Sequence, residues 1–284
     1  MQWVNACIKK LIQSCEVFHV LEFRDLRIMF GTRVAVDSIS FTLAQGESLA
    51  VVGESGSGKS VTALATLGLL PKNAIVKGDI LFEGKNVCAM NNSELQQIRG
   101  KKIAMIFQEP MTSLNPVFSI GEQILETIVA HESISRREAR LRTFSLLEEV
   151  GIAIDRFHSY PHELSGGMRQ RVVIAIALAC KPSVLIADEP TTALDASTSL
   201  QIITLLKDLQ KNRRMAIMFI THDLCLVPTI ADSICVMRHG TIVEFGDTLR
   251  VLQTPNHAYT KALSACIPSL QTKQRRLPTI EDVC

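Results

Sequence analysis

The chain has 284 residues, of which 47% are hydrophobic and 20% are charged, as expected for one large globular domain or two small ones. Its formal net charge is +2, which argues against a nucleic-acid partner because such partners are bound by strongly basic faces. The longest uninterrupted apolar run, Val172–Cys180, is far shorter than the roughly 20 residues of a membrane-spanning helix. If the protein works at a membrane, it must dock onto other chains that cross it.

The first 20 residues lack the long apolar stretch and the small-residue cleavage site of a signal peptide. We interpret residues 1–20 as an N-terminal extension; an amphipathic segment and an upstream start codon are the alternatives. The eight cysteines form no C-x-x-C pair and no Cys/His cluster with zinc-ligand spacing. Several lie inside apolar runs, as reduced core cysteines do, which indicates a reducing, cytoplasmic compartment.

Two segments near the start are predicted to be strands of an antiparallel pair. Leu21 and Phe23 mark the first, and residues 38–43 alternate polar and apolar side chains in the second. A short loop containing Gly31 separates the two, so we expect them to run in opposite directions.

Four later apolar runs are continuous rather than alternating, which is typical of strands buried on both faces of a parallel sheet. They are Leu49–Val52, Ile103–Phe107, Val184–Ala187 and Met215–Ile220. Helical periodicity follows most of them; after the candidate N-cap Asp195, leucine and isoleucine recur at helical spacing from Leu200 to Leu209. Strands that alternate with helices predict an α/β fold with a mostly parallel sheet core.

Residues 117–160 interrupt this alternation with two predicted helices, Ile120–His131 and Arg136–Val150, the second capped by Ser135. We interpret this segment as a helical insertion. Further along, Ile234–Met237 and Thr241–Phe245 are predicted to form a hairpin. From Thr254 onward the polar, proline-containing sequence predicts a short helix and a loose tail.

A glycine-rich segment after the strand Leu49–Val52 has the pattern of a phosphate-binding P-loop: Gly53, Glu54, Ser55, Gly56, Ser57, Gly58, Lys59 and Ser60. The glycines let backbone N–H groups turn toward phosphate oxygens, and the predicted helix Val61–Leu70 adds the positive end of its dipole. Lys59 supplies a charge for the β and γ phosphates, and Ser60 supplies a hydroxyl to Mg²⁺. By composition alone, about one chain in a hundred of this length has the pattern by chance. No internal repeat is visible, so one nucleotide site per chain is expected.

Two acidic residues, Asp188 and Glu189, end the strand Val184–Ala187. In P-loop enzymes a strand-end aspartate holds Mg²⁺, and we assign this role to Asp188. Glu189 is then placed to polarise the attacking water as a general base.

Between these two motifs stand Leu164, Ser165, Gly166, Gly167, Met168, Arg169, Gln170 and Arg171, and here the chain resembles the ABC ATPase family and its LSGG-x-x-Q-R signature. Ser165, Gly166 and Gly167 precede a predicted helix, Gln170–Cys180, whose N-terminus can receive a γ-phosphate. The resemblance implies that this phosphate belongs to ATP held by an opposite subunit, so that two cassettes sandwich two nucleotides.

The remaining elements implied by the resemblance occur in the expected order. Gln108 matches the Q-loop glutamine that contacts Mg²⁺ and couples to membrane subunits, and His222 matches the switch histidine that contacts the γ-phosphate. The segment Ala193-Leu194-Asp195 resembles the D-loop, which touches the partner's site. Phe30 is the aromatic residue expected to stack on adenine, where the family often has Tyr. The resemblance spans roughly Leu21–Ser269.

Two stretches resemble one branch of the family, the ATPases of peptide and nickel importers. They are Gln108–Pro116 and Thr254–Leu263, the second with Ala258 where the branch usually has Pro. Many relatives carry a cysteine-rich tail that holds an iron–sulfur cluster. Here only Cys266 and Cys284 remain in that region, too few for four thiolate ligands, so we predict no cluster.

The resemblance and the residues together predict an ABC-type P-loop NTPase with an N-terminal antiparallel β subdomain and a helical insertion. The expected divisions are residues 1–20, an ATPase domain at 21–253 with a helical subdomain at about 117–165, and a C-terminal extension and tail at 254–284.

The expected function is ATP hydrolysis that powers import of di- and oligopeptides, with ATP and Mg²⁺ as cofactors. Implied partners are two transmembrane permease subunits, a second ABC ATPase and an extracytoplasmic solute-binding protein, with the chain peripheral on the cytoplasmic face of the inner membrane. The alternatives are a nickel or other small-solute importer, an exporter subunit, a soluble ABC ATPase of translation or DNA repair, and a non-enzymatic regulator.

Overall fold

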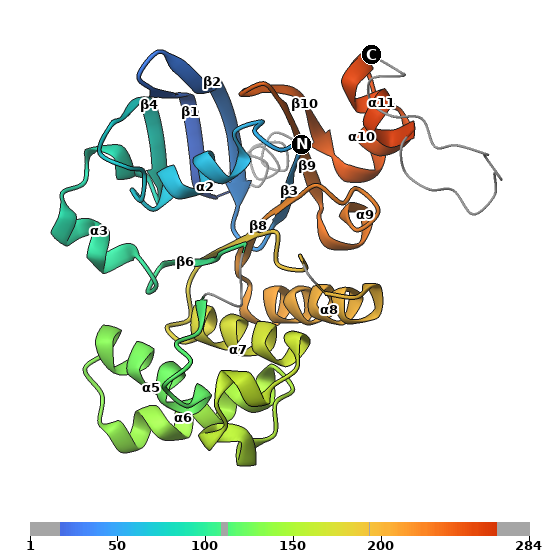
Figure 1. Ribbon diagram of the computed structural model, residues 1–284. Coiled ribbons are helices and arrows are strands. Elements are labelled where there is room, and N and C mark those ends of the chain that lie inside the picture. The colour runs from blue at the N-terminus through green and yellow to red at the C-terminus, as the bar shows by residue number, and fades with distance from the viewer. Residues whose placement is uncertain (1–17, 109–112, 193, 266–284) are drawn as a thin grey trace, which may run out of the picture.

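The computed structural model describes residues 18–108, 113–192 and 194–265 (Figure 1). Its first sheet has four strands in the order β2-β1-β4-β5, and every neighbouring pair is antiparallel. These strands are β1 (His19–Phe30), β2 (Arg33–Ala44), β4 (Ala74–Phe82) and β5 (Lys85–Asn86). The predicted antiparallel pairing of the first two strands is confirmed, although both strands are longer than the alternating patterns indicated.

The second sheet has six strands in the order β10-β9-β3-β8-β7-β6. These are β3 (Ser48–Val52), β6 (Ile103–Ile106), β7 (Val184–Asp188), β8 (Ala216–Thr221), β9 (Ser233–Arg238) and β10 (Thr241–Asp247). All neighbouring strands from β9 to β6 are parallel, and β10 pairs with β9 as the predicted antiparallel hairpin. The four continuous apolar runs are therefore confirmed as strands of one parallel sheet.

The continuous apolar runs face two separate hydrophobic cores. In β3, Ala50 and Val52 belong to a core shared with the helices, whereas Leu49 and Val51 belong to a core shared with the antiparallel sheet. Successive strand residues point to opposite faces, so a strand covered on both faces needs an apolar residue at every position.

Twelve helical segments are described between and after the strands. They are α2 (Lys59–Thr66), η1 (Val87–Ala89), α3 (Asn92–Ile98), α5 (Ile120–His131), α6 (Arg136–Glu149), η2 (Ile154–His158), η3 (Pro161–Glu163), α7 (Gly166–Leu178), α8 (Ala196–Arg213), α9 (Val227–Ile230), α10 (Thr248–Gln253) and α11 (Ala258–Ala265). The predicted caps form: the Ser135 hydroxyl accepts from the Glu138 N–H at 3.2 Å, and the Asp195 carboxylate accepts from the Thr198 N–H at 2.9 Å.

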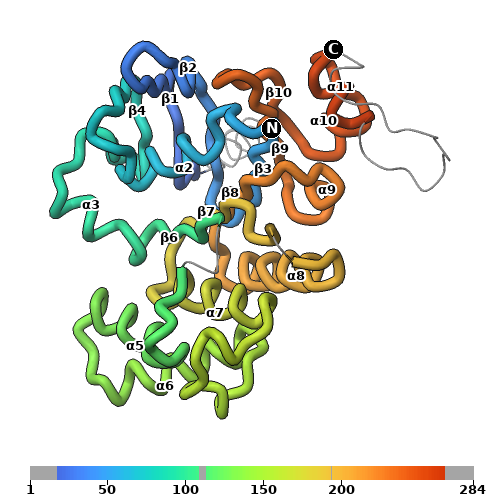
Figure 2. Tube along the Cα trace, in the orientation of Figure 1, coloured from blue at the N-terminus to red at the C-terminus, as the bar shows by residue number. Residues whose placement is uncertain are grey.

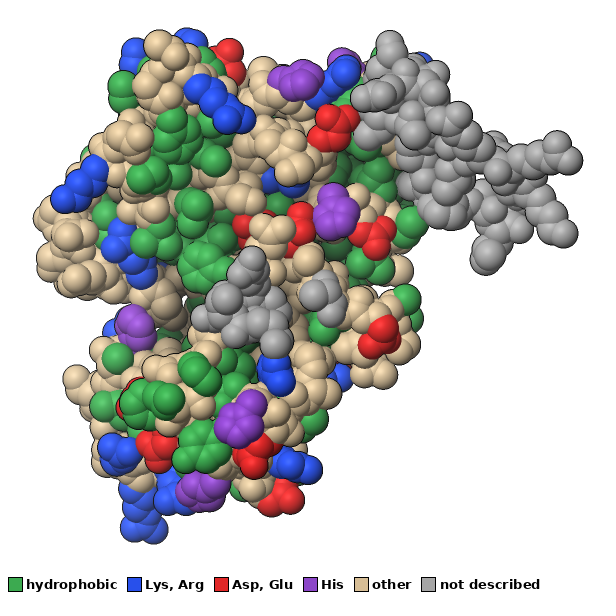
Figure 3. Space-filling view, viewed as in Figure 1, with side chains coloured by type: hydrophobic (Ala, Val, Ile, Leu, Met, Phe, Trp, Pro, Cys, Tyr) green, Lys and Arg blue, Asp and Glu red, His purple; other side chains and the backbone are tan. Residues whose placement is uncertain are grey.

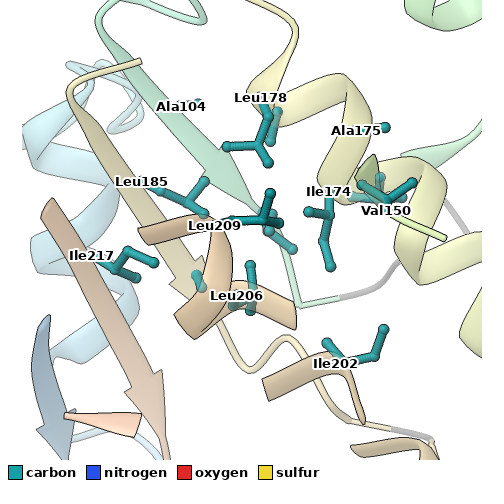
Figure 4. Packing of buried hydrophobic residues seen from close by; sticks show 14 of the residues in the cluster. Ala104, Val150, Ile174, Ala175, Leu178, Leu185, Ile202, Leu206, Leu209 and Ile217 are labelled. Carbon is teal, nitrogen blue, oxygen red and sulfur yellow. The ribbon is translucent and has the colours of Figure 1, made fainter. Parts of the chain in front are cut away.

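Helices α7 and α8 cover one face of the parallel sheet. Leu178 of α7 and Leu206 and Leu209 of α8 point toward Leu185 of β7, with Ala104 of β6 and Ile217 of β8 alongside (Figure 4). This layer fixes the direction of β7, whose carboxyl end carries Asp188 and Glu189.

The helical segment between β6 and α7 forms a lobe apart from the sheets. Figure 2 shows the chain entering this lobe after β6 and returning through α7 to β7. Inside it, Phe157 of η2 is buried against Gly121 of α5, where a Cβ would approach the ring to 2.3 Å. The space-filling view shows the two lobes with side chains of both charges interspersed on this face (Figure 3). Within the described ranges, no helix is both long and apolar enough to cross a membrane.

The sequence patterns missed β4, β5 and α3, which lie between α2 and β6. Gly78 divides β4 at φ +82°, and a Cβ there would lie 2.3 Å from the Asp25 carbonyl oxygen of β1. The β1–β4 register shifts between Arg24 and Arg27, so the glycine sits where β4 passes a bulge in its neighbour. The glycine in the middle of β4 is therefore explained by a contact with β1, which is distant in sequence. Because glycine is unusual inside a strand, the sequence pattern did not predict β4.

Candidate functional site

The phosphate loop connects the carboxyl end of β3 to the start of α2. Gly58, at φ +101°, occupies the N-cap position of α2, and a Cβ there would lie 2.7 Å from the Ala35 carbonyl oxygen. Gly53 is more restricted, because its Cβ would lie 2.1 Å from the Met237 carbonyl oxygen at the end of β9. The loop can follow this path only with glycine at both positions.

Lys59 is held inside the loop, with only 6% of its surface exposed. Its Nζ donates to the carbonyl oxygens of Gly53 and Glu54, both at 2.8 Å, and approaches Ser57 Oγ at 3.3 Å. Burial lowers the pKa of Lys59, although the charges of Glu189 and Asp188 act in the opposite direction. The ammonium group is thus a poorly solvated cation, a good match for the phosphates of a nucleotide.

A pocket of about 340 Å³ opens over the loop. Its described lining residues come from the P-loop, the start of α2, the first two strands and the segments just after β6 and β7: Phe30, Arg33, Ala35, Ser55, Gly56, Gly58, Lys59, Ser60, Val61, Gln108 and Glu189. The aromatic ring of Phe30 and the ammonium of Lys59 therefore share one cavity, which can accommodate a base and a phosphate chain together.

Asp188 ends β7 beside this pocket and is 4% exposed. Burial raises the pKa of Asp188, opposed by a hydrogen bond from Ser60. Its Oδ1 is buried and has no hydrogen-bond partner among the described residues. A buried carboxylate oxygen without a partner, on a carboxylate that is bonded to the Ser60 hydroxyl, is the kind of oxygen ligand that Mg²⁺ prefers.

The carboxylate of Glu189 is fixed by three side chains. Gln108 Nε2 donates to Oε2 at 3.0 Å, Thr192 Oγ1 donates to Oε2 at 2.9 Å, and His222 Nδ1 lies 2.9 Å from Oε1. Burial raises the pKa of Glu189, but the hydrogen bonds from His222, Thr192 and Gln108 outweigh it, so the pKa lies below its usual range. The group is ionised at neutral pH and can accept a proton.

The strand order explains why these residues meet. Gln108 follows β6, Glu189 follows β7 and His222 follows β8, and these three strands are neighbours in the parallel sheet. The carboxyl ends of parallel strands lie at one edge of a sheet, where ligands of α/β proteins bind. Three candidate residues separated by up to 114 positions, 222 − 108, are thus hydrogen-bonded in one cluster.

Ser165, Gly166 and Gly167 lie elsewhere, at the N-terminus of α7. The Ser165 hydroxyl accepts from the Met168 N–H at 3.3 Å, and Ser165 and Gly166 are exposed. Of the described residues that line the phosphate pocket, none comes from this segment. An exposed helix N-terminus without an acidic residue in its first turn suits an anion that arrives from outside.

Gly167→Ala is expected to destabilise the signature segment. A Cβ at this position would lie 2.5 Å from Thr198 Cγ2 of α8, a β-branched side chain with little freedom to move. We expect the free energy of unfolding to fall by about 1–3 kcal/mol, as overpacking commonly causes. Urea denaturation measures it, with Gly166→Ala as control because its Cβ would meet only Leu194 Cδ2 at 3.4 Å. Equal stability of the two variants would contradict the prediction.

Sequence patterns alone did not reveal Thr192, Arg33 or the second cavity beside Glu189. Thr192 lies three residues after Glu189 and could have been found as a turn hydroxyl. The second cavity, of about 390 Å³, is lined by Glu189, Thr192, Leu194 and His222 among others.

In the predicted D-loop, Ala193 lies outside the described residues, and Asp195 caps α8. Hydrogen bonds from Ser197 and Thr198 hold the pKa of Asp195 well below its usual range.

Comparison with known proteins decides the family. The model of the ABC transporter family matches residues 36–192, more than half of the chain. The chain belongs to the ABC transporter family. Its enzymatic activity is therefore ATP hydrolysis. A second family model, the C-terminal region of oligopeptide/dipeptide transporters, matches residues 243–283.

Individual ATP-binding transport proteins are also similar to this ABC ATPase. It is 50% identical to the oligopeptide transport ATP-binding protein OppD of Bacillus subtilis, over 90% of this chain and 74% of that protein. It is 44% identical to the dipeptide transport ATP-binding protein DppD of the same species, over 92% of this chain and 81% of that protein. Among solved structures, the dimeric ATP-binding cassette MJ0796 with ADP and Pi matches at a TM-score of 0.70 and 26% identity, over 80% of this chain and 98% of that one.

Proposed function

We propose that this ABC ATPase powers the import of di- and oligopeptides. The observation that carries the proposal is the match of residues 243–283 to the C-terminal region of oligopeptide/dipeptide transporters. The two transport ATPases named above, one for oligopeptides and one for dipeptides, support the same cargo class.

In the proposed reaction, Glu189 accepts a proton from the water that attacks the γ-phosphate. His222, which contacts the same carboxylate, faces the γ-phosphate, and Lys59 neutralises charge on the β and γ phosphates. The backbone of Gly53–Gly58, including Glu54, Ser55, Gly56 and Ser57, surrounds the phosphates, and Phe30 stacks on the adenine.

Mg²⁺ would be held by Asp188, Ser60 and Gln108. The buried, unpartnered Oδ1 of Asp188 supports this assignment. Bound there, the metal would neutralise charge that develops on the phosphates.

Ser165, Gly166 and Gly167 are proposed to bind the ATP of a second ABC ATPase, either a related chain or another copy. The exposed N-terminus of α7 supports this role, as does the absence of these three residues from the described lining of the chain's own pocket. Closing of the two-subunit sandwich would pull on two transmembrane permease subunits through the segment after β6.

The complex would also contain an extracytoplasmic solute-binding protein, with the ATPase at the cytoplasmic face of the inner membrane. The ATPase domain would comprise residues 21–253, with a helical subdomain at about 117–165, and residues 254–284 would form the extension of the peptide branch. Residues 1–17 and 266–284 lie outside the described residues, and with them most of the predicted N-terminal extension, the tail, Cys266 and Cys284.

Uptake by living cells tests the cargo. Deleting the gene in its own organism is expected to abolish uptake of a labelled tripeptide, and the wild-type gene is expected to restore it. A Glu189→Gln gene should not restore uptake, whereas Glu148→Gln, a change on the exposed face of α6, should. Loss of ⁶³Ni uptake with normal peptide uptake would favour the nickel alternative, and no change in either would favour a soluble ABC ATPase.

A further inference from the structure

Tyr259 of α11 reaches from the C-terminal region to the phosphate loop. The residue has no exposed surface and lies within the segment that matches the oligopeptide/dipeptide C-terminal model. Its hydroxyl accepts a hydrogen bond from the Glu54 N–H at 3.0 Å. In Figure 1, α11 lies beside β10 and α10, so this contact joins the last described helix to the first motif of the ATP site.

The peptide group between Gly53 and Glu54 is held on both sides. Its N–H, from Glu54, donates to Tyr259 Oη, and its carbonyl oxygen, from Gly53, accepts from Lys59 Nζ at 2.8 Å. Peptide planarity makes the orientation of one group determine the orientation of the other. Hydrogen bonds at the two ends of one peptide also polarise each other and become stronger together.

The ring of Tyr259 is positioned by the end of β9. The guanidinium carbon of Arg238 lies 4.7 Å from the ring centroid, which is a cation–π contact. The preceding residue, Met237, supplies the carbonyl oxygen that leaves no room for a Cβ at Gly53. The start of the phosphate loop is therefore enclosed by β9 on one side and by Tyr259 on another.

We infer that Tyr259 is a positioning residue of the ATP site, which acts through the Gly53–Glu54 peptide on Lys59. The C-terminal region thereby contributes to nucleotide affinity. Binding free energies are reciprocal, so ATP in the pocket must in turn stabilise the packing of α11. The inference depends on the ATP site alone and is independent of the cargo.

Tyr259→Phe tests the inference, because it removes one hydroxyl and keeps the ring. The Glu54 N–H then loses its buried acceptor, and the Kd for MgATP, measured by calorimetry, is expected to rise about three- to tenfold. Tyr160→Phe is the matched control: it makes the same change at the only other tyrosine of the chain, which is 41% exposed. Its Kd should stay within about twofold of wild type. Equal Kd values for wild type and Tyr259→Phe would overturn the inference.

Hydrogen exchange distinguishes positioning from general support of the fold. In Tyr259→Phe, amides of residues 53–58 should exchange faster; faster exchange confined to residues 258–265 would overturn the inference. Should this variant fail to fold, wild type provides the second measurement. Saturating MgATP is expected to slow hydrogen exchange in α11. An exchange rate in α11 that is the same with and without MgATP would also overturn the inference.

Discussion

Glu189→Gln is expected to lower the turnover number for ATP hydrolysis by about 100- to 10,000-fold, which is the range that general-base catalysis contributes. ATP binding is expected to remain intact. Glutamine keeps the size and one acceptor oxygen, so contacts with Gln108 and Thr192 can persist. An amide cannot accept the proton of the attacking water. Because hydrogen bonds hold the pKa of Glu189 below its usual range, the wild-type group is already ionised at neutral pH, and the full effect should be visible there.

A phosphate-release assay and MgATP calorimetry on the purified variant measure the two quantities separately. Glu148→Gln, an exposed change on α6, is the control and should behave as wild type. Light scattering with and without MgATP adds a second result. A doubled mass in Glu189→Gln would indicate that two copies close on two nucleotides, whereas an unchanged mass would indicate that a different ATPase is needed. Normal turnover in Glu189→Gln would refute the general-base role.

Lys59→Ala is expected to raise the Kd for MgATP by about 30-fold or more. Removing one member of a buried, hydrogen-bonded charge pair loses about 2–5 kcal/mol, and each 1.4 kcal/mol is tenfold in affinity. Lys59 is suited to such a pair because it is buried and its Nζ is already directed into the phosphate loop. Calorimetry checks the value, with Lys72→Ala, an exposed lysine before β4, as control.

The same lysine predicts how ATP affinity depends on pH. Burial lowers the pKa of Lys59 below the usual lysine value of 10.5, so the ammonium charge is lost as the pH rises through that lowered pKa. Wild-type affinity for MgATP should therefore be unchanged near neutral pH and should weaken as the pH rises. The weakening should begin at a lower pH than it would for a lysine with the usual pKa. Lys59→Ala should lack this decline, and a parallel decline in both proteins would assign it to another group.

Local sequence was sufficient for much of the fold. Strands with apolar residues at every position, such as residues 49–52 and 184–187, can only be buried on both faces, and the structure packs one core on each side of them. Helix starts were equally local, because the Ser135 and Asp195 side chains bond to N–H groups three residues away. The phosphate loop was visible for the same reason: its glycines, Lys59 and Ser60 act within eight consecutive residues.

Contacts between distant segments decided the rest. Strand β4 was not predicted because it contains Gly78. This glycine is required where β4 passes a bulge in β1, some 50 residues earlier in the chain. The sequence named Gln108, Glu189 and His222 separately, but only the order β8-β7-β6 brings them into one hydrogen-bonded cluster. Tyr259 had no recognisable link to the phosphate loop, since its hydrogen-bond partner Glu54 lies 205 positions away. The sequence by itself thus determined what each short segment could bind or form. The pairing of strands and the packing of α11 determined which segments act together, because those contacts depend on chain topology and not on neighbouring residues.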